Sequence, residues 1–284
     1  MNFKRYNENT RLIPVPSTNI IPERDIDKTP IMECNHLGID FGGLTAVDEF
    51  NIAIGRTEIS GLIGPNGAGK TTVFNLLTKV YQPTRGTVLI DGLDTHNMNT
   101  TQVNQAGIAR TFQNIRLFNN LTVEDNIKVA MNGQLKTNLV ESLLRLPSFR
   151  REEEAAHHRA MELLSLFHME KYANALAGAL PYGVQRRVEI LRALATNPSI
   201  LLLDEPAAGM NPSETAELTE NIRRIRDTFH IAVLLIEHDM DLVMNLCEGL
   251  AVLNFGRIIA KGTPEEIQKN PAVIEAYLGK QKGA

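Results

Sequence analysis

The chain has 284 residues, a formal net charge of −4 and two cysteines, Cys34 and Cys247. This length is enough for one large domain or one domain with an inserted lobe, and the charge excludes the basic footprint of a non-specific nucleic-acid binder. Two cysteines far apart in the sequence are typical of a reducing compartment, although the sequence leaves a disulfide between them open.

Residues 1–30 are predicted to form a flexible arm, because they are polar, contain four prolines and offer little apolar surface to bury. They contain no apolar core of signal-peptide length. No run in the chain approaches the roughly 18 apolar residues that cross a bilayer. We therefore expect a soluble protein whose association with a membrane depends on a partner.

Strand-like patterns begin at Ile31. Residues 86–92 carry β-branched side chains and run into an Asp-Gly turn, which is typical of a β-hairpin. This pattern predicts an antiparallel element in the first third of the chain.

The stretch from Thr122 to about Gly178 has a helical period. Thr122 followed by Asp125 is a candidate capping box, and residues 152–167 form the pattern of an amphipathic helix. His157 and His158 are neighbours on that helix and point about 100° apart. We expect both histidines to be solvated, because they cannot share a metal ion.

Two short apolar runs follow, at residues 199–203 and 231–236. Their length and β-branched content indicate strands that are buried on both faces of a parallel sheet. Near the C-terminus, Thr263 as a cap, Pro264 and Glu266 predict the start of a helix that continues through about residue 280.

A phosphate-binding loop of the form G-x-x-x-x-G-K-[ST] lies between a predicted strand at 59–63 and a predicted helix. Backbone N–H groups of such a loop turn toward phosphate oxygens at a helix N-terminus. Lys70 should reach the β- and γ-phosphates, and the Thr71 hydroxyl should hold Mg²⁺. The flanking strand and helix disfavour the alternative of a structural Gly-rich turn. The expected nucleotide-binding residues are Gly64, Pro65, Asn66, Gly67, Ala68, Gly69, Lys70, Thr71 and Thr72.

An acidic pair ends the first apolar run. The C-terminal end of a parallel strand faces the ligand crevice, so Asp204 is expected to bind Mg²⁺ directly or through water. Glu205 beside it can polarise the attacking water as a general base. A helix cap or a solvated acidic pair is the alternative.

Four further residues are candidates because of their order along the chain. His238 follows the second apolar run, where it could sense a γ-phosphate. Gln113 lies between the phosphate loop and the helical stretch, where its amide could contact Mg²⁺ or water. Phe41 could stack on adenine with Val47 completing that face, and core packing is the alternative for Phe41.

The segment Leu180-Pro181-Tyr182-Gly183-Val184-Gln185-Arg186 is a Gly-centred turn that opens a basic helix ahead of Asp204. It resembles the signature motif of ATP-binding-cassette (ABC) ATPases, and the other motifs occur in the order of that family. The resemblance covers residues 31–279. It implies an α/β P-loop NTPase of ABC type at 31–284, with a mixed core sheet, an antiparallel β-subdomain and an inserted α-helical lobe at about 115–185.

The resemblance also implies roles for individual residues. In the family, two domains sandwich ATP, and the signature of one, here Leu180, Pro181, Tyr182, Gly183, Val184 and Gln185, contacts the γ-phosphate held by the other. It implies catalytic roles for Glu205, His238 and Gln113, and Mg²⁺ contacts for Thr71, Gln113 and Asp204. Pro181 stands where the family has a serine, and Val184 replaces a polar side chain. We expect a weaker hold on the γ-phosphate from both changes. Asn211 replaces the usual Asp of the D-loop, as this subgroup often does.

Finer motifs resemble the LivG-type ATPases of branched-chain amino-acid importers. They include residues 41–47, 109–113, 134–137, 147–151, 205–212, 236–240, 262–267 and 273–279. The resemblance implies ATP and Mg²⁺ as cofactors and a place on the cytoplasmic side of the inner or plasma membrane. The implied partners are membrane permease subunits, a second ABC ATPase (a paralogue or a second copy) and, indirectly, a substrate-binding protein, with no nucleic acid. Phe118 could anchor a permease helix or belong to the lobe core.

Three alternatives remain open at this point. The chain could be the ATPase of another ABC importer or exporter, for a lipid or an amide. It could be a non-transport ABC ATPase, although those usually have two cassettes or a long insertion. It could also be a phosphotransferase or a small GTPase, which lack a signature helix ahead of the strand that carries the acidic pair.

Overall fold

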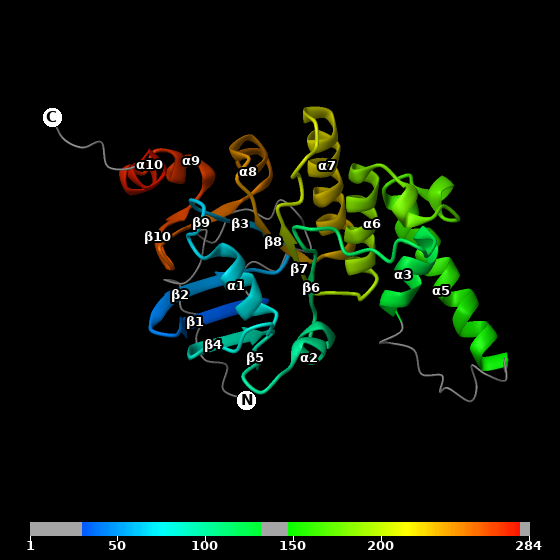
Figure 1. The fold of residues 1–284 in the computed structure, drawn as a ribbon, viewed down its shortest axis with the longest axis horizontal. Helices are drawn as coiled ribbons and strands as arrows, with labels where there is room; N and C mark the ends of the chain where they lie inside the picture. Colours follow the sequence, from blue (N-terminus) through cyan, green and yellow to red (C-terminus); the bar gives the residue numbers. More distant parts are fainter. Residues whose placement is uncertain (1–29, 132–146, 279–284) are drawn as a thin grey trace.

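The computed structural model describes residues 30–131 and 147–278 (Figure 1). Apart from Pro30, the predicted arm at 1–30 lies outside these residues. The same holds for the motif at 134–137 and for the end of the predicted C-terminal helix beyond 278.

A four-stranded antiparallel sheet forms one layer of the molecule, with strand order β2-β1-β4-β5. The turn between β4 and β5 confirms the predicted hairpin, because Asp91 and Gly92 both have positive φ, at 48° and 77°. Two such residues match the right-handed twist of the flanking strands. The strands of this sheet are β1 (Met32–Phe41), β2 (Leu44–Ile54), β4 (Arg85–Ile90) and β5 (Leu93–Asp94).

A six-stranded sheet forms the second layer, with order β10-β9-β3-β8-β7-β6. It is parallel from β9 to β6, and β10 pairs antiparallel with β9. The two predicted apolar strands are confirmed as neighbours β7 and β8. Its strands are β3 (Ile59–Ile63), β6 (Ile108–Arg110), β7 (Ile200–Asp204), β8 (Ala232–Ile236), β9 (Gly249–Asn254) and β10 (Arg257–Gly262).

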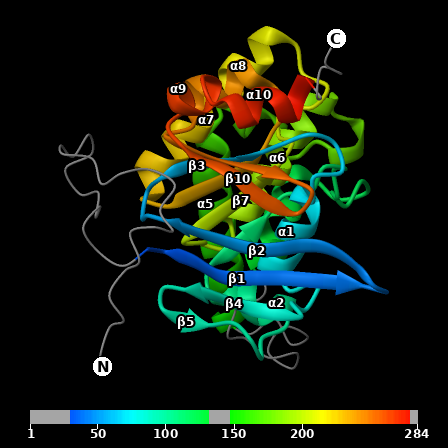
Figure 2. The same cartoon turned by 90° about the vertical axis from the view of Figure 1, so that its left-hand side faces the viewer.

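Both faces of this second sheet are buried, as its sequence predicts. Leu201 and Leu203 of β7 belong to one core cluster, whereas Ile200 and Leu202 belong to the other. The first cluster includes residues of α7 and α8, and the second includes residues of α1 and of the first sheet. Figures 1 and 2 show how these helices and the two sheets are arranged. The helices of this body are α1 (Lys70–Leu77), α2 (Thr100–Gln105), α7 (Pro212–Phe229), α8 (Met240–Leu246), α9 (Pro264–Gln268) and α10 (Pro271–Leu278).

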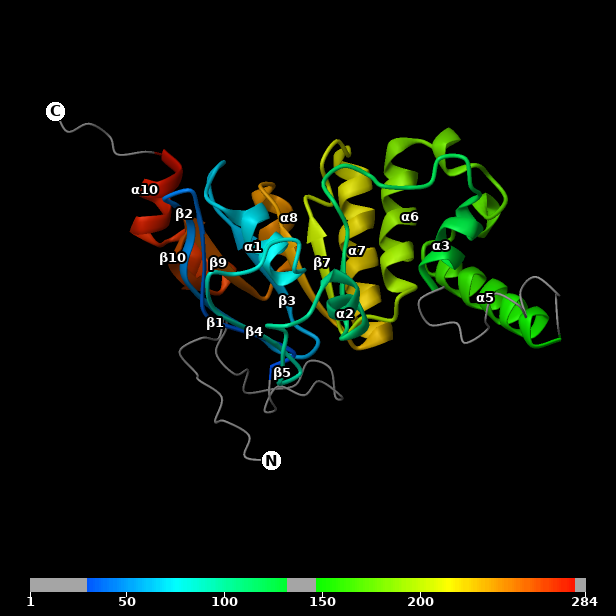
Figure 3. The same ribbon diagram turned by 60° about the horizontal axis from the view of Figure 1, so that its bottom comes forward.

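A helical lobe extends from the edge of the second sheet (Figure 3). Thr122 caps the first lobe helix, because its hydroxyl accepts the Asp125 backbone N–H at 3.0 Å. In the predicted capping box the Asp125 carboxylate would accept a backbone N–H, and here it accepts the Thr122 hydroxyl. The lobe contains α3 (Val123–Met131), α5 (Pro147–Leu166), η3 (Glu170–Tyr172), η4 (Ala177–Ala179) and α6 (Tyr182–Leu194).

The predicted helical stretch through Gly178 is wrong beyond Leu166. His168 has a φ of 53°, a left-handed conformation that ends the helix. The chain then returns along the start of α3, where the carbonyls of Ala175 and Ala173 accept the first N–H groups of Val123 and Glu124. These bonds pair the N–H groups at the N-terminus of α3, which have no partner within their own helix. A sequence pattern does not show that a segment about 50 residues later supplies the acceptors. An antiparallel sheet, a mostly parallel sheet and an inserted helical lobe together confirm the predicted fold class.

Candidate nucleotide site

The phosphate loop joins β3 to α1, and its shape depends on glycine. Gly64 has a φ of 151°, and a Cβ there would lie 2.1 Å from the carbonyl oxygen of Leu253. Gly67, at a φ of 78°, faces open space. Gly69 is the N-cap of α1 and offers no side-chain cap. The first N–H groups of α1 are therefore available to an anion.

Lys70 lies at the centre of this loop. Its Nζ donates to the carbonyl oxygens of Gly64 at 2.7 Å and Pro65 at 3.0 Å. Burial lowers the pKa of Lys70, and the negative charges of Glu205 and Asp204 oppose that shift. The charge of the acidic pair thus acts on an ammonium group that the phosphate loop holds, and this group can exchange loop carbonyls for phosphate oxygens.

Asp204 ends β7 in a buried ion pair that the sequence did not suggest. Its Oδ2 accepts Arg110 Nη2 at 2.7 Å, with side-chain exposures of 4% and 6%. Arg110 also donates to Asn75 Oδ1 at 2.7 Å. Its guanidinium carbon lies 5.0 Å from the ring centre of Phe112. The sequence signal for this ion pair was the position of Arg110, a charged residue directly after the apolar pair Ile108-Ala109.

The predicted catalytic residues meet at the C-terminal ends of neighbouring strands. Gln113 Nε2 donates to Glu205 Oε2 at 2.8 Å. His238 Nδ1 lies 4.0 Å from Glu205 Oε1, and the His238 side chain is 64% exposed. Glu205 has a φ of 47°, a costly conformation outside glycine that a functional position can require. The structure brings together three side chains that are spread over 125 positions of the chain, from Gln113 to His238.

Glu237 is a second residue that sequence reasoning missed. Its buried carboxylate accepts backbone N–H groups from Ala207 at 2.9 Å and His238 at 3.1 Å. Burial raises the pKa of Glu237, and these backbone bonds oppose the shift. The residue therefore ties the loop after Glu205 to the loop that carries His238.

The signature segment forms the start of α6. Pro181 is the N-cap, and its carbonyl accepts the N–H groups of Val184 and Gln185, each at 3.0 Å. Pro181 and Tyr182 are exposed, whereas Val184 is buried in the lobe core. Gln185 Nε2 donates back to the Leu180 carbonyl at 2.8 Å. The Val184 side chain is therefore packed in the core, and its N–H is already bonded to the Pro181 carbonyl.

The signature and the phosphate loop of this chain lie apart. Figures 1 and 3 place α1 and α6 on opposite sides of strand β7. Gly183 is close to α7, because a Cβ there would lie 3.2 Å from Glu214 Oε1. Asn211, the substituted D-loop residue, caps α7 in a capping box with Glu214. An amide oxygen caps a helix as well as a carboxylate does, which accounts for Asn at this position.

The two predicted adenine contacts differ in exposure. Phe41 ends β1 on the surface, with its ring edge-on to Tyr81 at 5.3 Å between ring centres. Val47 is fully buried in the core between the sheets, so its side chain packs there and offers no open face. An adenine contact by Val47 stays a prediction. Tyr81 is a further exposed aromatic next to Phe41.

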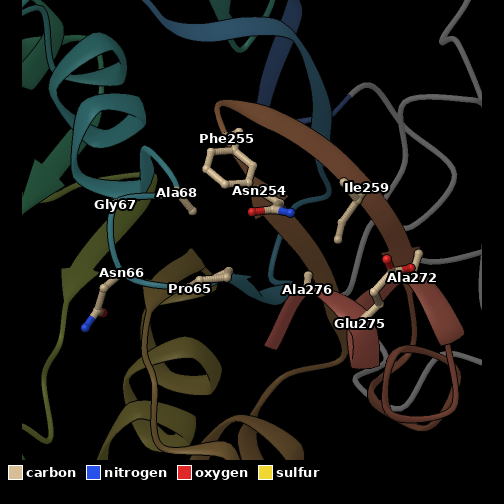
Figure 4. A pocket seen from close by; sticks show the side chains of 10 residues that line it. All are labelled: Pro65, Asn66, Gly67, Ala68, Asn254, Phe255, Ile259, Ala272, Glu275 and Ala276. Carbon is tan, nitrogen blue, oxygen red and sulfur yellow. The ribbon is translucent and has the colours of Figure 1, made fainter. Parts of the chain in front are cut away.

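A pocket of about 560 Å³ lies behind the phosphate loop (Figure 4). Asn254 at the end of β9 and Phe255 in the β9–β10 turn form one side, and Glu275 of α10 lies at the other. Burial raises the pKa of the Tyr277 hydroxyl in α10, and a hydrogen bond with the Gly64 backbone opposes the shift. The C-terminal helix thus lines this pocket together with the phosphate loop.

The three predicted magnesium ligands carry oxygen atoms of a suitable kind. Thr71 supplies a hydroxyl, Gln113 an amide and Asp204 a carboxylate, which are hard ligands of the kind that Mg²⁺ prefers. Within residues 30–131 and 147–278, no cluster of three or more His, Cys, Asp or Glu residues is placed to hold a metal. Elsewhere, His157 Nδ1 contacts Glu124 Oε1 at 2.8 Å on the lobe surface.

Comparison with known proteins identifies the family of this chain. The model of the ABC transporter family matches residues 47–208. That of the branched-chain amino acid ATP-binding cassette transporters matches residues 257–282. The chain is 49% identical over 250 residues to the high-affinity branched-chain amino acid transport ATP-binding protein LivG of Escherichia coli K12, covering 88% of this chain and 98% of LivG. It is 47% identical, with the same coverage, to the corresponding protein BraF of Pseudomonas aeruginosa.

Solved structures agree with these sequence relatives. An ATP-binding cassette of an ABC transporter in its ADP conformation superposes with a TM-score of 0.77 at 29% identity. The match covers 89% of this chain and 100% of that one. In the part of the chain that the structure describes, no helix has the length and apolar composition needed to span a membrane.

Proposed function

This chain belongs to the ATP-binding subunits of ABC transporters and is an ATPase, and from this premise we propose that it powers an importer of branched-chain amino acids. The observation that carries the catalytic part is the meeting of Lys70, Asp204, Glu205, Gln113 and His238 at the ends of neighbouring strands. Ligands bind at this edge of parallel sheets.

The proposed hydrolysis begins with the exchange of hydrogen-bond partners. Lys70 leaves the carbonyls of Gly64 and Pro65 for phosphate oxygens of ATP, which the glycine-shaped loop surrounds with N–H groups. Mg²⁺, held by Thr71 and Asp204 with Gln113 nearby, would neutralise charge on the phosphates. Glu205 then accepts the proton of the attacking water, and His238 contacts the γ-phosphate.

A second nucleotide domain completes the site in this proposal. The signature of this chain is remote from its own phosphate loop (Figure 1), so its exposed start serves the ATP of a partner cassette. That partner is a paralogue or a second copy. The two cassettes dock on membrane permeases at the cytoplasmic side, and a substrate-binding protein acts through the permeases. Phe118, 51% exposed beside the Gln113 loop, would contact a permease helix.

Branched-chain substrates are proposed because a family model and the sequence relatives agree. The C-terminal family model is specific for that transporter group, and the LivG and BraF identities of 47–49% span nearly the whole of those proteins. A choline transport protein of Bacillus subtilis and a lipopolysaccharide export protein of Haemophilus influenzae are each 33% identical. Those lower values favour amino acids over these other cargoes.

The catalytic proposal is tested with Glu205→Gln in the assembled transporter. We expect ATP binding to persist and ATPase turnover to fall by about 10²–10⁴-fold, the usual value of a general base. Glu217→Gln, an exposed carboxylate on α7, is the matched control and should keep wild-type turnover. Full turnover of Glu205→Gln would refute the assignment of the base.

The substrate proposal is tested by uptake in cells that lack the gene. Complementation should restore uptake of labelled leucine, isoleucine and valine and leave choline uptake unchanged. Restored choline uptake without the amino acids would transfer the assignment to another importer class.

A further inference from the structure

Arg186 is a fully buried arginine on α6 whose guanidinium connects the signature to the Gln113 loop. It has 0% exposed side chain. Its Nη1 donates to the Phe112 carbonyl at 2.5 Å and to Glu189 Oε2 at 2.9 Å. Its Nη2 donates to the Gln113 carbonyl at 2.6 Å and to the Tyr182 hydroxyl at 2.8 Å. One planar group thus joins two segments, helix α6 and the loop at Phe112 and Gln113.

The charge of this group is balanced locally. Glu189 is buried beside it and also accepts the backbone N–H of Arg116 at 3.1 Å. Burial raises the pKa of Glu189, and the bond to Arg116 and the charge of Arg186 oppose that shift. In the described residues, Arg186 Nε has no hydrogen-bond partner although it is buried. An unpaired buried N–H is costly, so packing alone is a poor reason for an arginine here.

One end of the connection lies at a catalytic group and the other lies at the signature. Gln113, whose carbonyl Arg186 holds, donates its side-chain amide to Glu205. Tyr182, at the other end, is 45% exposed at the start of the signature. A Cβ on Gly209 of the D-loop would lie 3.5 Å from the Tyr182 ring. The tyrosine is therefore placed to meet both a partner cassette and this chain's own D-loop.

We propose that Arg186 is a positioning residue that couples Tyr182 in the signature to Gln113 in the same chain. When a partner's nucleotide engages the Tyr182 hydroxyl, Arg186 Nη2 shares or loses that acceptor and its bond to the Gln113 carbonyl changes. The Gln113–Glu205 contact changes with it. Occupancy of one nucleotide site thereby sets the geometry of the general base in the other. This inference rests on the proposed two-cassette function.

The test uses Tyr182→Phe in the assembled transporter, because Arg186 variants risk misfolding. The substitution removes only the hydroxyl, so we expect wild-type ATP binding by the isolated subunit. The melting temperature should fall by only a few degrees, because Arg186 Nη2 loses one buried acceptor and keeps the Gln113 carbonyl. The turnover number should fall about fivefold, the effect of one hydrogen bond. Tyr172→Phe, on the same lobe and outside the Arg186 contacts, is the control and should keep full turnover.

A double-mutant cycle with Gln113→Ala separates coupling from separate contributions. If the connection ends at Gln113, adding Tyr182→Phe to Gln113→Ala should change turnover by less than about twofold. Independent, multiplying losses would overturn the proposal, as would wild-type turnover of Tyr182→Phe alone. ATPase of the wild-type transporter in the same preparations tests the proposed function separately, because its absence would refute that function whatever the variants do.

Discussion

Replacing Arg110 by Met should destabilise the nucleotide-free protein strongly. Methionine has a similar length and keeps the contacts with Phe74 and Phe112, but it removes the only cation that the described residues place within 4.0 Å of the Asp204 carboxylate. Breaking a buried pair by deleting one partner costs about 3–5 kcal/mol. For a protein of this size, about 2 °C of melting temperature per kcal/mol is lost, which gives a decrease of about 6–10 °C.

The assay is thermal unfolding of four proteins: wild type, Arg110→Met, Asp204→Asn and the double variant. The double variant should recover much of the loss, because no uncompensated charge is left buried. Mg²⁺ with ADP should raise the melting temperature of Arg110→Met more than that of wild type, since Asp204 is then free to bind the metal. Arg159→Met breaks an exposed pair with Glu162 and should cost under about 1 kcal/mol.

Two results would refute this reasoning about Arg110. One is a melting temperature of Arg110→Met within about 1 °C of wild type, far below the expected cost. The other is a double variant whose loss equals the sum of the two single losses, which would mean that Arg110 and Asp204 stabilise the fold independently.

Further expectations concern capping, pH and thiol reactivity. Asn211→Ala should cost about 1 kcal/mol in chemical unfolding by removing the α7 cap, whereas Asn211→Asp should be nearly neutral, and equal losses would contradict the capping role. Burial raises the pKa of Glu124, but hydrogen bonds to His157 and Lys128 outweigh it and leave that pKa below its usual 4.5. The stabilisation is therefore present above about pH 4.5 and lost as pH falls through the lower folded-state pKa, so a wild-type advantage over Glu124→Gln that persists at pH 2 would refute it. Burial raises the pKa of the Cys34 and Cys247 thiols well above their usual range, so iodoacetamide at pH 8 should label both only after unfolding, and rapid labelling of the native protein would contradict this.

Sequence patterns predicted the sheets and the phosphate loop well, because those features are local. The short apolar run of β7 indicates a strand buried on both faces, and the turn residues Asp91 and Gly92 favour a hairpin turn. Both signals lie within the segment that they describe. The stretch after Leu166 failed because its ending depends on His168 and on hydrogen bonds to α3, more than 40 residues earlier. A helical period records which side chains are apolar and contains no information on which distant carbonyls accept its N–H groups.

The candidate site shows the same division. Motif order placed Lys70, Asp204, Glu205 and His238 along the chain, and the structure brings them together. Arg110 and Arg186 were missed because their meaning depends on tertiary partners. As sequence they are basic residues near a loop and on a basic helix, which are usually solvated. Only the three-dimensional structure shows both guanidinium groups to be buried against backbone and carboxylate oxygens.

The position of Gly64 against Leu253 has a consequence for synthesis of the protein. Strand β3, which leads into the phosphate loop, has β8 and β9 as its neighbours, and both are encoded more than 160 residues later. At about 5–20 residues per second, the ribosome needs roughly 10–40 s to travel from the loop to β9. Throughout that interval the phosphate loop lacks its contact with Leu253 of β9. We therefore expect the phosphate loop to reach its final shape only after β9 has been synthesised.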